Sequence, residues 1–324
     1  MIRLAIWGYG HLGSGVEHAI RQNLDMVLTG IYTRRDPASL HSPFGTPVYS
    51  SATLPEHKDE IDVLLLCGGS ATDLMPYTPE LAKYFTLVDS FDTHAKIPEH
   101  FATVDAAAKA AGTVAVISAG WDPGLFSLAR VYGLSVLPEA SRYTFWGRGV
   151  SQGHSNAIRR VPGVRNAVQY TVPIEKALDA VRKGERPEFT ARQMHLRECY
   201  VVLEEGADPE KVEREIKNMP NYFADYDTVV YFVTEESLER EHGGLPHGGT
   251  VILSGKTGND NTQRVEFTLD LDSNPEFTAC VLVACARAAY RMHARGESGC
   301  RTMLDIAPRD LSPLSPEEQR RTLL

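Results

Sequence analysis

The sequence predicts an α/β protein in which a doubly wound parallel sheet is joined to a second, α+β domain with a mixed or antiparallel sheet. In the first third of the chain, short runs rich in Val, Ile and Leu alternate with segments long enough for crossover helices. Beyond about residue 120, strand-like runs follow one another with few helices between them. The length of 324 residues is sufficient for two domains, each with its own hydrophobic core.

The first domain is expected to contain five strands, at Arg3–Trp7, Val27–Tyr32, Asp62–Leu66, Leu87–Asp89 and Val114–Ser118. The helix expected at Pro98–Ala111 begins with proline, which suits the first turn of a helix, and stops at Gly112. Because parallel strands need crossover helices, this order of elements predicts the doubly wound sheet.

The second domain is expected to contain six strands, at Arg142–Trp146, Gln169–Val172, Glu198–Leu203, Val229–Val233, Gly249–Ser254 and Arg264–Leu271. Only one helix, Pro209–Lys217, is expected among them, with Asp208 as its N-cap. Strands that follow one another so directly favour an open, mixed or antiparallel sheet.

A long helix is expected from Asn274-Pro275 to the glycine at 296, with small or apolar residues at helical spacing. Such a stripe covers one face of a sheet, so we expect the helix to return to the first domain. The expected organisation is residues 1–120 rejoined by about 272–310, residues 121–271 as a second domain, and a C-terminal tail at 311–324.

Composition argues against several classes of protein. The chain has 42 acidic and 33 basic residues, a net charge of −9, which does not fit a broad basic face for nucleic acid. No apolar run reaches the roughly 18 residues of a membrane-spanning helix. Five scattered cysteines fit reduced thiols, and no H-E-x-x-H motif occurs. We therefore expect a cytoplasmic protein without a metal, a nucleic-acid partner or a membrane anchor.

A complete G-x-G-x-x-G motif lies directly after the first expected strand and before a helix, as Gly8, Tyr9, Gly10, His11, Leu12 and Gly13. Its glycines allow a tight turn and close approach of a pyrophosphate to the backbone, at the positive end of the following helix. The position at the start of a βαβ series favours a Rossmann-like dinucleotide-binding domain over a plain glycine-rich turn.

The second expected strand leads into Thr33, Arg34 and Arg35, at the place where an NAD-binding protein usually carries an acidic residue. Two guanidinium groups suit the 2′-phosphate of NADP through charge-assisted hydrogen bonds. The alternative is that both arginines are simply solvated. The sequence therefore favours NADP over NAD as the cofactor.

The third expected strand is followed by a loop of small residues, Cys67, Gly68, Gly69, Ser70, Ala71 and Thr72. Ligands of open α/β sheets bind at the carboxyl edge of the strands, so this loop is placed to pass beside the nicotinamide ribose. A plain strand-to-helix turn is the alternative for this segment.

Five further segments are too specific for generic loops, at Val88–His94, Ser118–Gly124, Phe145–Ser155, Pro246–Gly249 and Ser273–Pro275. Together with the glycine motif and the arginine pair, they resemble the meso-diaminopimelate dehydrogenase family over nearly the whole chain. The resemblance implies an NADP-dependent amino-acid dehydrogenase of lysine and cell-wall precursor biosynthesis, with a homodimeric assembly and an active site between its domains.

The implied reaction is the reversible oxidative deamination of the D-centre of meso-2,6-diaminopimelate to L-2-amino-6-oxopimelate, ammonia and NADPH. Hydride loss requires a neutral amine, so a nearby carboxylate must accept its proton. Asp92 and Asp122 are the two candidates for this role, and both match substrate-binding positions of the family. Capping of a helix by Asp122, before Pro123, and a turn role for Asp92 are the structural alternatives.

The resemblance also assigns residues to the two ligands. Thr171, Arg197 and His247 are expected to hold the L-configured end of the substrate through its carboxylate, and Trp146, Gln152, Gly153 and Asn274 to line the cavity. Core packing for Trp146, a loop hydrogen bond for His247 and an N-cap for Asn274 are the alternatives. The residues expected beside the cofactor, in addition to the two aspartates, are Ser90, Phe91, Ala119, Gly120, Trp121 and Pro123.

Two other functions remain open from the sequence. One is an NADP-dependent dehydrogenase of similar layout that acts on another amino acid or on a sugar alcohol. Sugar-alcohol dehydrogenases of this layout usually carry a Glu-Lys-Pro motif, where this chain has Asp89-Ser90-Phe91. The other is a non-catalytic NADP sensor.

Overall fold

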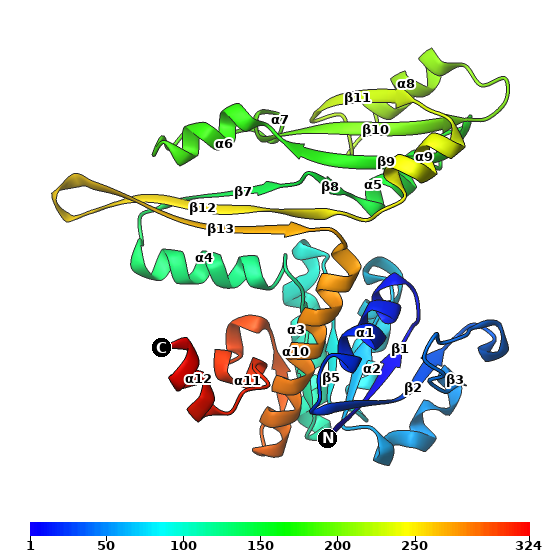
Figure 1. The fold of residues 1–324 in the computed structure, drawn as a ribbon, viewed down its shortest axis with the longest axis vertical. Helices are drawn as coiled ribbons and strands as arrows, with labels where there is room; N and C mark the ends of the chain where they lie inside the picture. The colour runs from blue at the N-terminus through cyan, green and yellow to red at the C-terminus, as the bar shows by residue number, and fades with distance from the viewer. The chain divides into compact units, whose positions relative to one another are not determined.

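The computed structural model describes residues 1–324, apart from the side chain of Ala71. The chain forms two units, one made of Met1–Leu128 and Pro275–Leu324, the other of Ala129–Asn274. We call them unit 1 and unit 2 (Figure 1).

Unit 1 is built on a seven-stranded sheet with the order β14-β6-β5-β4-β1-β2-β3. All neighbouring strands are parallel, and the direction of winding reverses at β1. The strands are β1 (Ile2–Trp7), β2 (Met26–Thr33), β3 (Val48–Ser50), β4 (Val63–Leu66), β5 (Leu87–Asp89), β6 (Val114–Val116) and β14 (Gly299–Arg301). The predicted doubly wound parallel sheet is thereby confirmed.

Helices cover both faces of this sheet because successive strand residues point to opposite sides. Leu4 and Ile6 share a core with Val283 of α10 (Asn274–Ala294). Ala5 shares a second core with Val104 of α3 (Ile97–Ala111). The remaining α-helices that begin in this unit are α1 (His11–Arg21), α2 (Met75–Leu81), α4 (Leu125–Val136), α11 (Pro308–Leu311) and α12 (Pro316–Leu323).

The C-terminal region contains more structure than the sequence predicts. Strand β14 pairs with β6, and residues of the expected tail form α12. Ser315 caps the N-terminus of α12, and the side chains of Ser315 and Glu318 each accept the other's backbone N–H. β14 has only three residues, too few for a recognisable period. Ser315 followed three residues later by Glu318 is a capping-box pattern, and α12 could have been predicted from it.

Unit 2 contains two sheets, which confirms the predicted mixed and antiparallel strand pairing. A four-stranded sheet has the order β11-β10-β9-β8, with β10 and β11 parallel and the other pairs antiparallel. A three-stranded antiparallel sheet has the order β13-β12-β7. The strands are β7 (Ser141–Trp146), β8 (Gly149–Val150), β9 (Val164–Pro173), β10 (His195–Leu203), β11 (Asp227–Phe232), β12 (His247–Thr257) and β13 (Asn261–Leu271).

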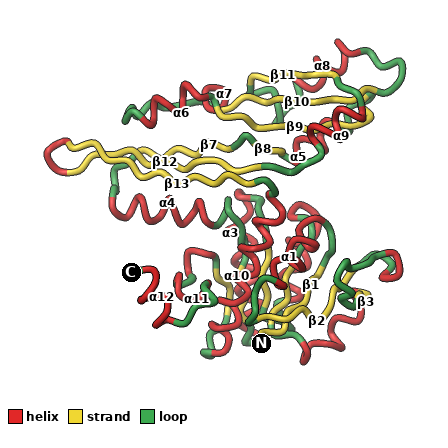
Figure 2. The backbone as a smooth tube through the Cα atoms, in the orientation of Figure 1, coloured by secondary structure: helices red, strands yellow, loops and turns green.

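The expectation of one helix among these strands is wrong. Besides α8 (Pro209–Lys217), unit 2 contains α5 (Gln152–Ile158), α6 (Glu175–Arg182), α7 (Ala191–Met194) and α9 (Glu235–His242), which Figure 2 shows as short red segments between long strands. Each of these additional helices spans at most eight residues and buries few side chains, such as Leu178 and Val181 of α6. Such short helices give a weak periodic signal.

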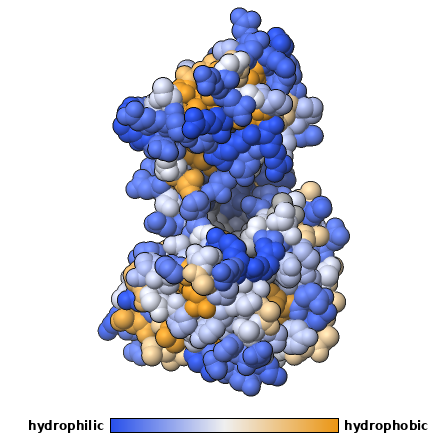
Figure 3. All heavy atoms as spheres, turned by 90° about the vertical axis from the view of Figure 1, so that its right-hand side faces the viewer, coloured by the Kyte–Doolittle hydropathy of each residue, from blue (hydrophilic) through white to orange (hydrophobic). Residues whose placement is uncertain are grey.

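The surface is consistent with the composition. In Figure 3, hydrophilic residues cover most of the visible face of each unit, and hydrophobic ones gather in small groups. Within the described residues, no helix is long and apolar enough to cross a membrane.

Candidate active site

The glycine motif of unit 1 forms the turn from β1 into α1. Gly8 has a φ of +90°, and a Cβ added at Gly13 would lie 2.4 Å from the Gly8 carbonyl oxygen, so both positions require glycine. Gly10 precedes α1 without a side-chain cap, and His11 and Leu12 begin the helix. The positive end of α1 is therefore suited to a pyrophosphate.

Arg34 and Arg35 follow β2 but have different partners. Arg34 forms an ion pair with Asp73 (Nη2 to Oδ1, 2.8 Å), and its guanidinium lies over the rings of Trp7 and Tyr77 at 5.1 and 5.3 Å. Burial alone would raise the pKa of Asp73, but the Gly69 N–H and Arg34 outweigh it, so the pKa is lowered. The sequence reasoning missed Asp73, which lies far along the chain.

Arg35 donates a hydrogen bond to the Tyr9 carbonyl oxygen inside the glycine motif. Its backbone N–H donates to the hydroxyl of Thr33, which is buried (N to Oγ1, 3.1 Å). Across the side chains that the structure describes, Arg35 forms no ion pair. It is therefore the cation of the pair whose charge is not yet compensated, and it lies next to the glycine turn.

Glu17 is a second residue that the sequence reasoning missed. This carboxylate of α1 is buried and accepts hydrogen bonds from the hydroxyls of Tyr9, Ser42 (2.6 Å) and Thr46. Burial, followed by Glu17, raises the pKa of Tyr9 to about 12, so the phenol stays a hydrogen-bond donor. Glu17 therefore fixes Tyr9, and with it the turn that Arg35 contacts.

The loops after β4, β5 and β6 lie at one edge of the sheet, because these neighbouring strands are parallel. Cys67, Gly68 and Gly69 follow β4, and Ser70 and Thr72 lie in a π-helical turn. The Ser70 hydroxyl accepts the Asp92 N–H at 2.9 Å and lies 3.4 Å from the Thr93 hydroxyl. The predicted cofactor loop is thus joined to the loop of Asp92. The side chain of Ala71 lies outside the described residues.

The two predicted aspartates come from the loops after β5 and β6. Asp92 is exposed and follows Ser90 and the fully buried Phe91. Asp122 is partly exposed and follows Ala119, Gly120 and Trp121. Helix α4 begins at Leu125, so Asp122 is not adjacent to its first residue and Pro123 is not in its first turn. The simple N-cap interpretation of Asp122 is therefore wrong.

In unit 2, Thr171 and Arg197 face each other on β9 and β10, and both are buried. Arg197 donates from Nη1 to the Thr171 hydroxyl, and its guanidinium lies 4.0 Å from the centre of the Tyr226 ring. Burial lowers the pKa of Arg197, and its Nε has no hydrogen-bond partner among the described atoms. A buried cation that forms no ion pair with a described carboxylate is suited to an anionic ligand.

His247 lies at the start of β12, next to the same sheet. A Cβ added at Gly149 would lie 2.4 Å from the His247 ring, and Gly149 pairs with Thr171. The ring Nδ1 accepts the N–H of Gly248 at 2.8 Å, so the loop hydrogen bond considered as an alternative is present. The structure thus brings Thr171, Arg197 and His247 into one region of unit 2.

Two histidines flank this region and were not predicted, of which His195 is buried and His154 partly buried. His195 Nε2 accepts the backbone N–H of Trp146 at 2.9 Å, and the two rings stack at 5.4 Å. His154 lies 2.7 Å from the Ser151 hydroxyl through Nδ1. Burial, and then the charge of Arg197, lower the pKa of each histidine to about 4. Both rings are therefore neutral near pH 7.

The remaining predicted residues lie at element ends. Trp146 ends β7 and is 37% exposed, so its ring is not simply part of the core. Gln152 and Gly153 are exposed in the first turn of α5. Asn274 is the first residue of α10, and its N–H donates to the Leu245 carbonyl oxygen at 2.9 Å.

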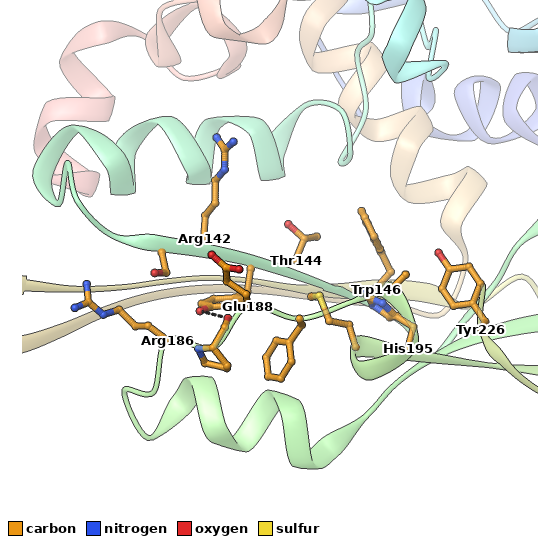
Figure 4. A pocket seen from close by; sticks show the side chains of 13 residues that line it. Arg142, Thr144, Trp146, Arg186, Glu188, His195 and Tyr226 are labelled. Atoms are coloured by element: carbon orange, nitrogen blue, oxygen red, sulfur yellow. Dashed lines mark hydrogen bonds between the residues drawn. The ribbon is translucent and has the colours of Figure 1, made fainter. Parts of the chain in front are cut away.

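Unit 2 also contains a cavity of about 730 Å³ between β7 and the segment 186–195. Figure 4 shows Trp146, His195 and Tyr226 toward one end of it and Arg186 toward the other. Among the predicted substrate residues, Trp146 alone belongs to its lining. Across the described part of the chain, no group of three or more His, Cys, Asp or Glu residues could hold a metal ion.

Comparison with known proteins gives consistent results. Residues 120–273 match the family model of the diaminopimelic acid dehydrogenase C-terminal domain. The meso-diaminopimelate D-dehydrogenase of Ureibacillus thermosphaericus is 58% identical over 323 residues, covering 100% of this chain and 99% of that protein.

Two solved structures are similar over the full length of this chain. One is a six-fold substituted meso-DAP dehydrogenase from Clostridium tetani with DAP, at 52% identity and a TM-score of 0.95, with 100% of both chains covered. The other is an engineered D-amino acid dehydrogenase bound to NADP+, at 46% identity and a TM-score of 0.88, with 100% of this chain and 99% of that chain covered.

Proposed function

The chain belongs to the meso-diaminopimelate D-dehydrogenase family, and we propose that it catalyses the NADP-dependent oxidative deamination of the D-centre of meso-2,6-diaminopimelate. The products are L-2-amino-6-oxopimelate, ammonia and NADPH, and the reverse reaction serves lysine and cell-wall precursor biosynthesis. The observation that carries the proposal is the buried Arg197 beside Thr171, which suits the carboxylate of a substrate end distant from the reacting carbon.

We propose that unit 1 binds the cofactor and unit 2 the far end of the substrate. The positive end of α1 suits the pyrophosphate, and Arg35 the 2′-phosphate. NADP, when bound, accepts the hydride from the substrate carbon. The nearby loops carry Ser90, Phe91 and residues 119–123, which border the nicotinamide in this proposal.

A numbering correspondence supports the substrate residues. Six positions are substituted in the Clostridium tetani structure. When two is subtracted from each position number, this chain has the residue type that was replaced there. They fall on Gln152, Thr171, Arg197, Pro246, His247 and Asn274. Five of these six are substrate residues predicted from the sequence. Pro246 lies in the segment Pro246–Gly249 and is added to the proposed site.

In the proposed mechanism, Asp92 or Asp122 accepts the proton of the substrate ammonium before hydride loss. Loss of the hydride from carbon and of a further proton from nitrogen leaves an imine. Water then adds to the imine carbon, and ammonia departs as the oxo product forms. Arg197, Thr171 and His247 hold the L-configured end, so only the D-centre is presented for reaction.

We also propose a homodimer in the cytoplasm. Two-fold dimers are the commonest soluble oligomers, and unit 2 has the long, largely exposed edge strand β13. All five cysteines are free thiols, as is usual in a reducing compartment.

The test follows NADPH formation by the purified protein with NADP and meso-diaminopimelate. The matched control is the LL-isomer, which has no D-centre and should give no turnover. Turnover of another amino acid without turnover of the meso compound would overturn the substrate assignment. Binding of NADP without any turnover would favour the sensor function.

A further inference from the structure

Asp89 is the last residue of β5, and its side chain is completely buried. It is the buried carboxylate nearest in sequence to Asp92, yet the proposed mechanism assigns it no task. Its hydrogen bonds connect the two loops that carry the proposed reacting aspartates.

One side of Asp89 holds backbone groups of both loops. Its Oδ1 accepts the N–H of Phe91 at 3.0 Å and the N–H of Ser118 at 2.9 Å. Its backbone oxygen accepts the N–H of Ala119 at 2.9 Å. Phe91 immediately precedes Asp92, and Ala119 lies three residues before Asp122. A single residue thus sets the spacing between the loop 90–94 and the loop 117–124.

The other side of the carboxylate is fixed by two helices. Its Oδ2 accepts the hydroxyl of Thr78 on α2 and Nε2 of His100 on α3, both at 2.8 Å. The hydrogen bond from His100 requires the tautomer with its proton on Nε2. The His100 ring also packs on Phe91, with 4.3 Å between ring centres. With donors on both oxygens, the carboxylate is held against rotation.

We propose that Asp89 is a positioning residue of the dehydrogenase reaction, because it fixes the spacing of the loops of Asp92 and Asp122. The inference rests on the proposed function, in which these two aspartates face the same substrate. A displacement of about 1 Å in a catalytic group costs on the order of 100-fold in rate, so such a tie has a kinetic consequence.

The test compares three variants of the full-length enzyme. Asp89→Ala removes the acceptor for both loops. Asp89→Asn keeps one oxygen for the loop N–H groups and turns its amide toward Thr78 and His100, which can both accept. Asp310→Ala is the matched control, since Asp310 is also a buried carboxylate of unit 1 but pairs with Arg295 instead (2.9 Å).

We expect Asp89→Ala to lower kcat/KM for meso-diaminopimelate by about 30-fold or more, with the Kd for NADP changed by less than about threefold. Asp89→Asn should restore kcat/KM to within about fivefold of the wild type, because its geometry is kept. Asp310→Ala should stay within about threefold, even though its melting temperature falls.

Three outcomes would overturn the inference while the wild type remains active. These are a wild-type kcat/KM in Asp89→Ala, an equal loss in Asp310→Ala, and failure of both Asp89 variants to fold. The last would assign the carboxylate to the stability of the fold rather than to loop spacing. A wild type without turnover of meso-diaminopimelate would instead overturn the proposed function, and this inference with it.

Discussion

At the scale of single residues, Arg34 and Arg35 are neighbours with different electrostatic surroundings. Arg34 is already paired with Asp73, whereas Arg35 donates hydrogen bonds to a hydroxyl and a carbonyl oxygen and forms no ion pair with the described side chains. A charge-assisted hydrogen bond contributes about 1.5–3 kcal/mol. We therefore expect Arg35→Ala to raise the Kd for NADP by about 10- to 100-fold and to leave the Kd for NAD within about threefold.

Fluorescence titration with NADPH and NADH measures both affinities of that variant. Arg3→Ala, which breaks a surface pair with Asp62 (2.7 Å), is the matched control and should bind both cofactors like the wild type. Equal weakening of both cofactors by Arg35→Ala would show that Arg35 does not read the 2′-phosphate.

His195 makes stability depend on pH in a defined window. Its pKa is about 4 in the folded protein and near 6.5 in an unfolded chain. Between these values the unfolded chain binds a proton that the folded one does not, so stability is lost as pH falls from 6.5 toward 4. His154 acts in the same window. We expect His195→Gln to reduce this loss, which thermal unfolding at a series of pH values measures.

The exposed His293 gives the control for that measurement. His293→Gln should follow the wild-type pH profile of the melting temperature. A wild-type pH profile in His195→Gln would mean that the pKa of His195 does not differ between the folded and the unfolded chain.

The residues whose local structure could be predicted from sequence are those that depend on a few neighbours in the chain. The turn at Gly8–Gly13 and the arginine pair are of this kind. Glu17, Asp89 and His195 are not, because their partners lie far along the chain. Asp89, for example, binds Ser118 across 29 positions. Only folding brings such a buried carboxylate and its donors together.

At the scale of elements, the contact between β8 and β12 is closely packed in the proposed substrate region. Gly149 on β8 leaves no room for a Cβ against the His247 ring of β12. Overpacking a tight contact costs about 1–3 kcal/mol, so Gly149→Ala should displace the ring and raise KM for meso-diaminopimelate about tenfold. We expect kcat to change less, because the two aspartates proposed to react lie in unit 1.

Steady-state kinetics at saturating NADP separate KM from kcat in this variant. Gly258→Ala is the control, since a Cβ there meets nothing within 4 Å, and it should behave like the wild type. An unchanged KM in Gly149→Ala would remove His247 from the substrate site.

The elements that sequence reasoning missed are the short ones. Strand β14 and helices α6 and α9 bury few side chains each. Neither the two-residue period of a strand nor the 3.6-residue period of a helix therefore extends over enough residues to be recognised. The long elements, such as β1 and α10, were predicted because many successive residues follow one pattern. Length alone does not decide what can be predicted, because the three-residue strands β5 and β6 were predicted from their Val- and Leu-rich sequences, whereas β14 (Gly-Cys-Arg) lacks that composition.

At the scale of the whole molecule, the chain builds one unit from two separated segments. The core of unit 1 contains Ile6 of β1 and Val283 of α10, far apart in sequence. The predicted return of the terminal helix needed only its apolar stripe. The register of the sheet in unit 1 and the added strand β14 depend on contacts between residues far apart in sequence, which no local pattern encodes.

The exposed edge of unit 2 gives the last prediction, on assembly. β13 spans Asn261–Leu271 at the edge of the three-stranded sheet, and most of its residues are exposed, including Phe267 at 37%. A long edge strand offers the backbone groups of its outer side to another chain, so we expect β13 to lie in the interface of a two-fold dimer.

Sedimentation should give twice the 35.8 kDa of one chain, and Phe267→Lys should shift the protein toward the monomer. Tyr231→Lys, on the edge strand β11 of the other sheet, is the matched control and should remain dimeric. A wild type at 35.8 kDa would exclude the dimer, and dissociation by Tyr231→Lys alone would place the interface at β11.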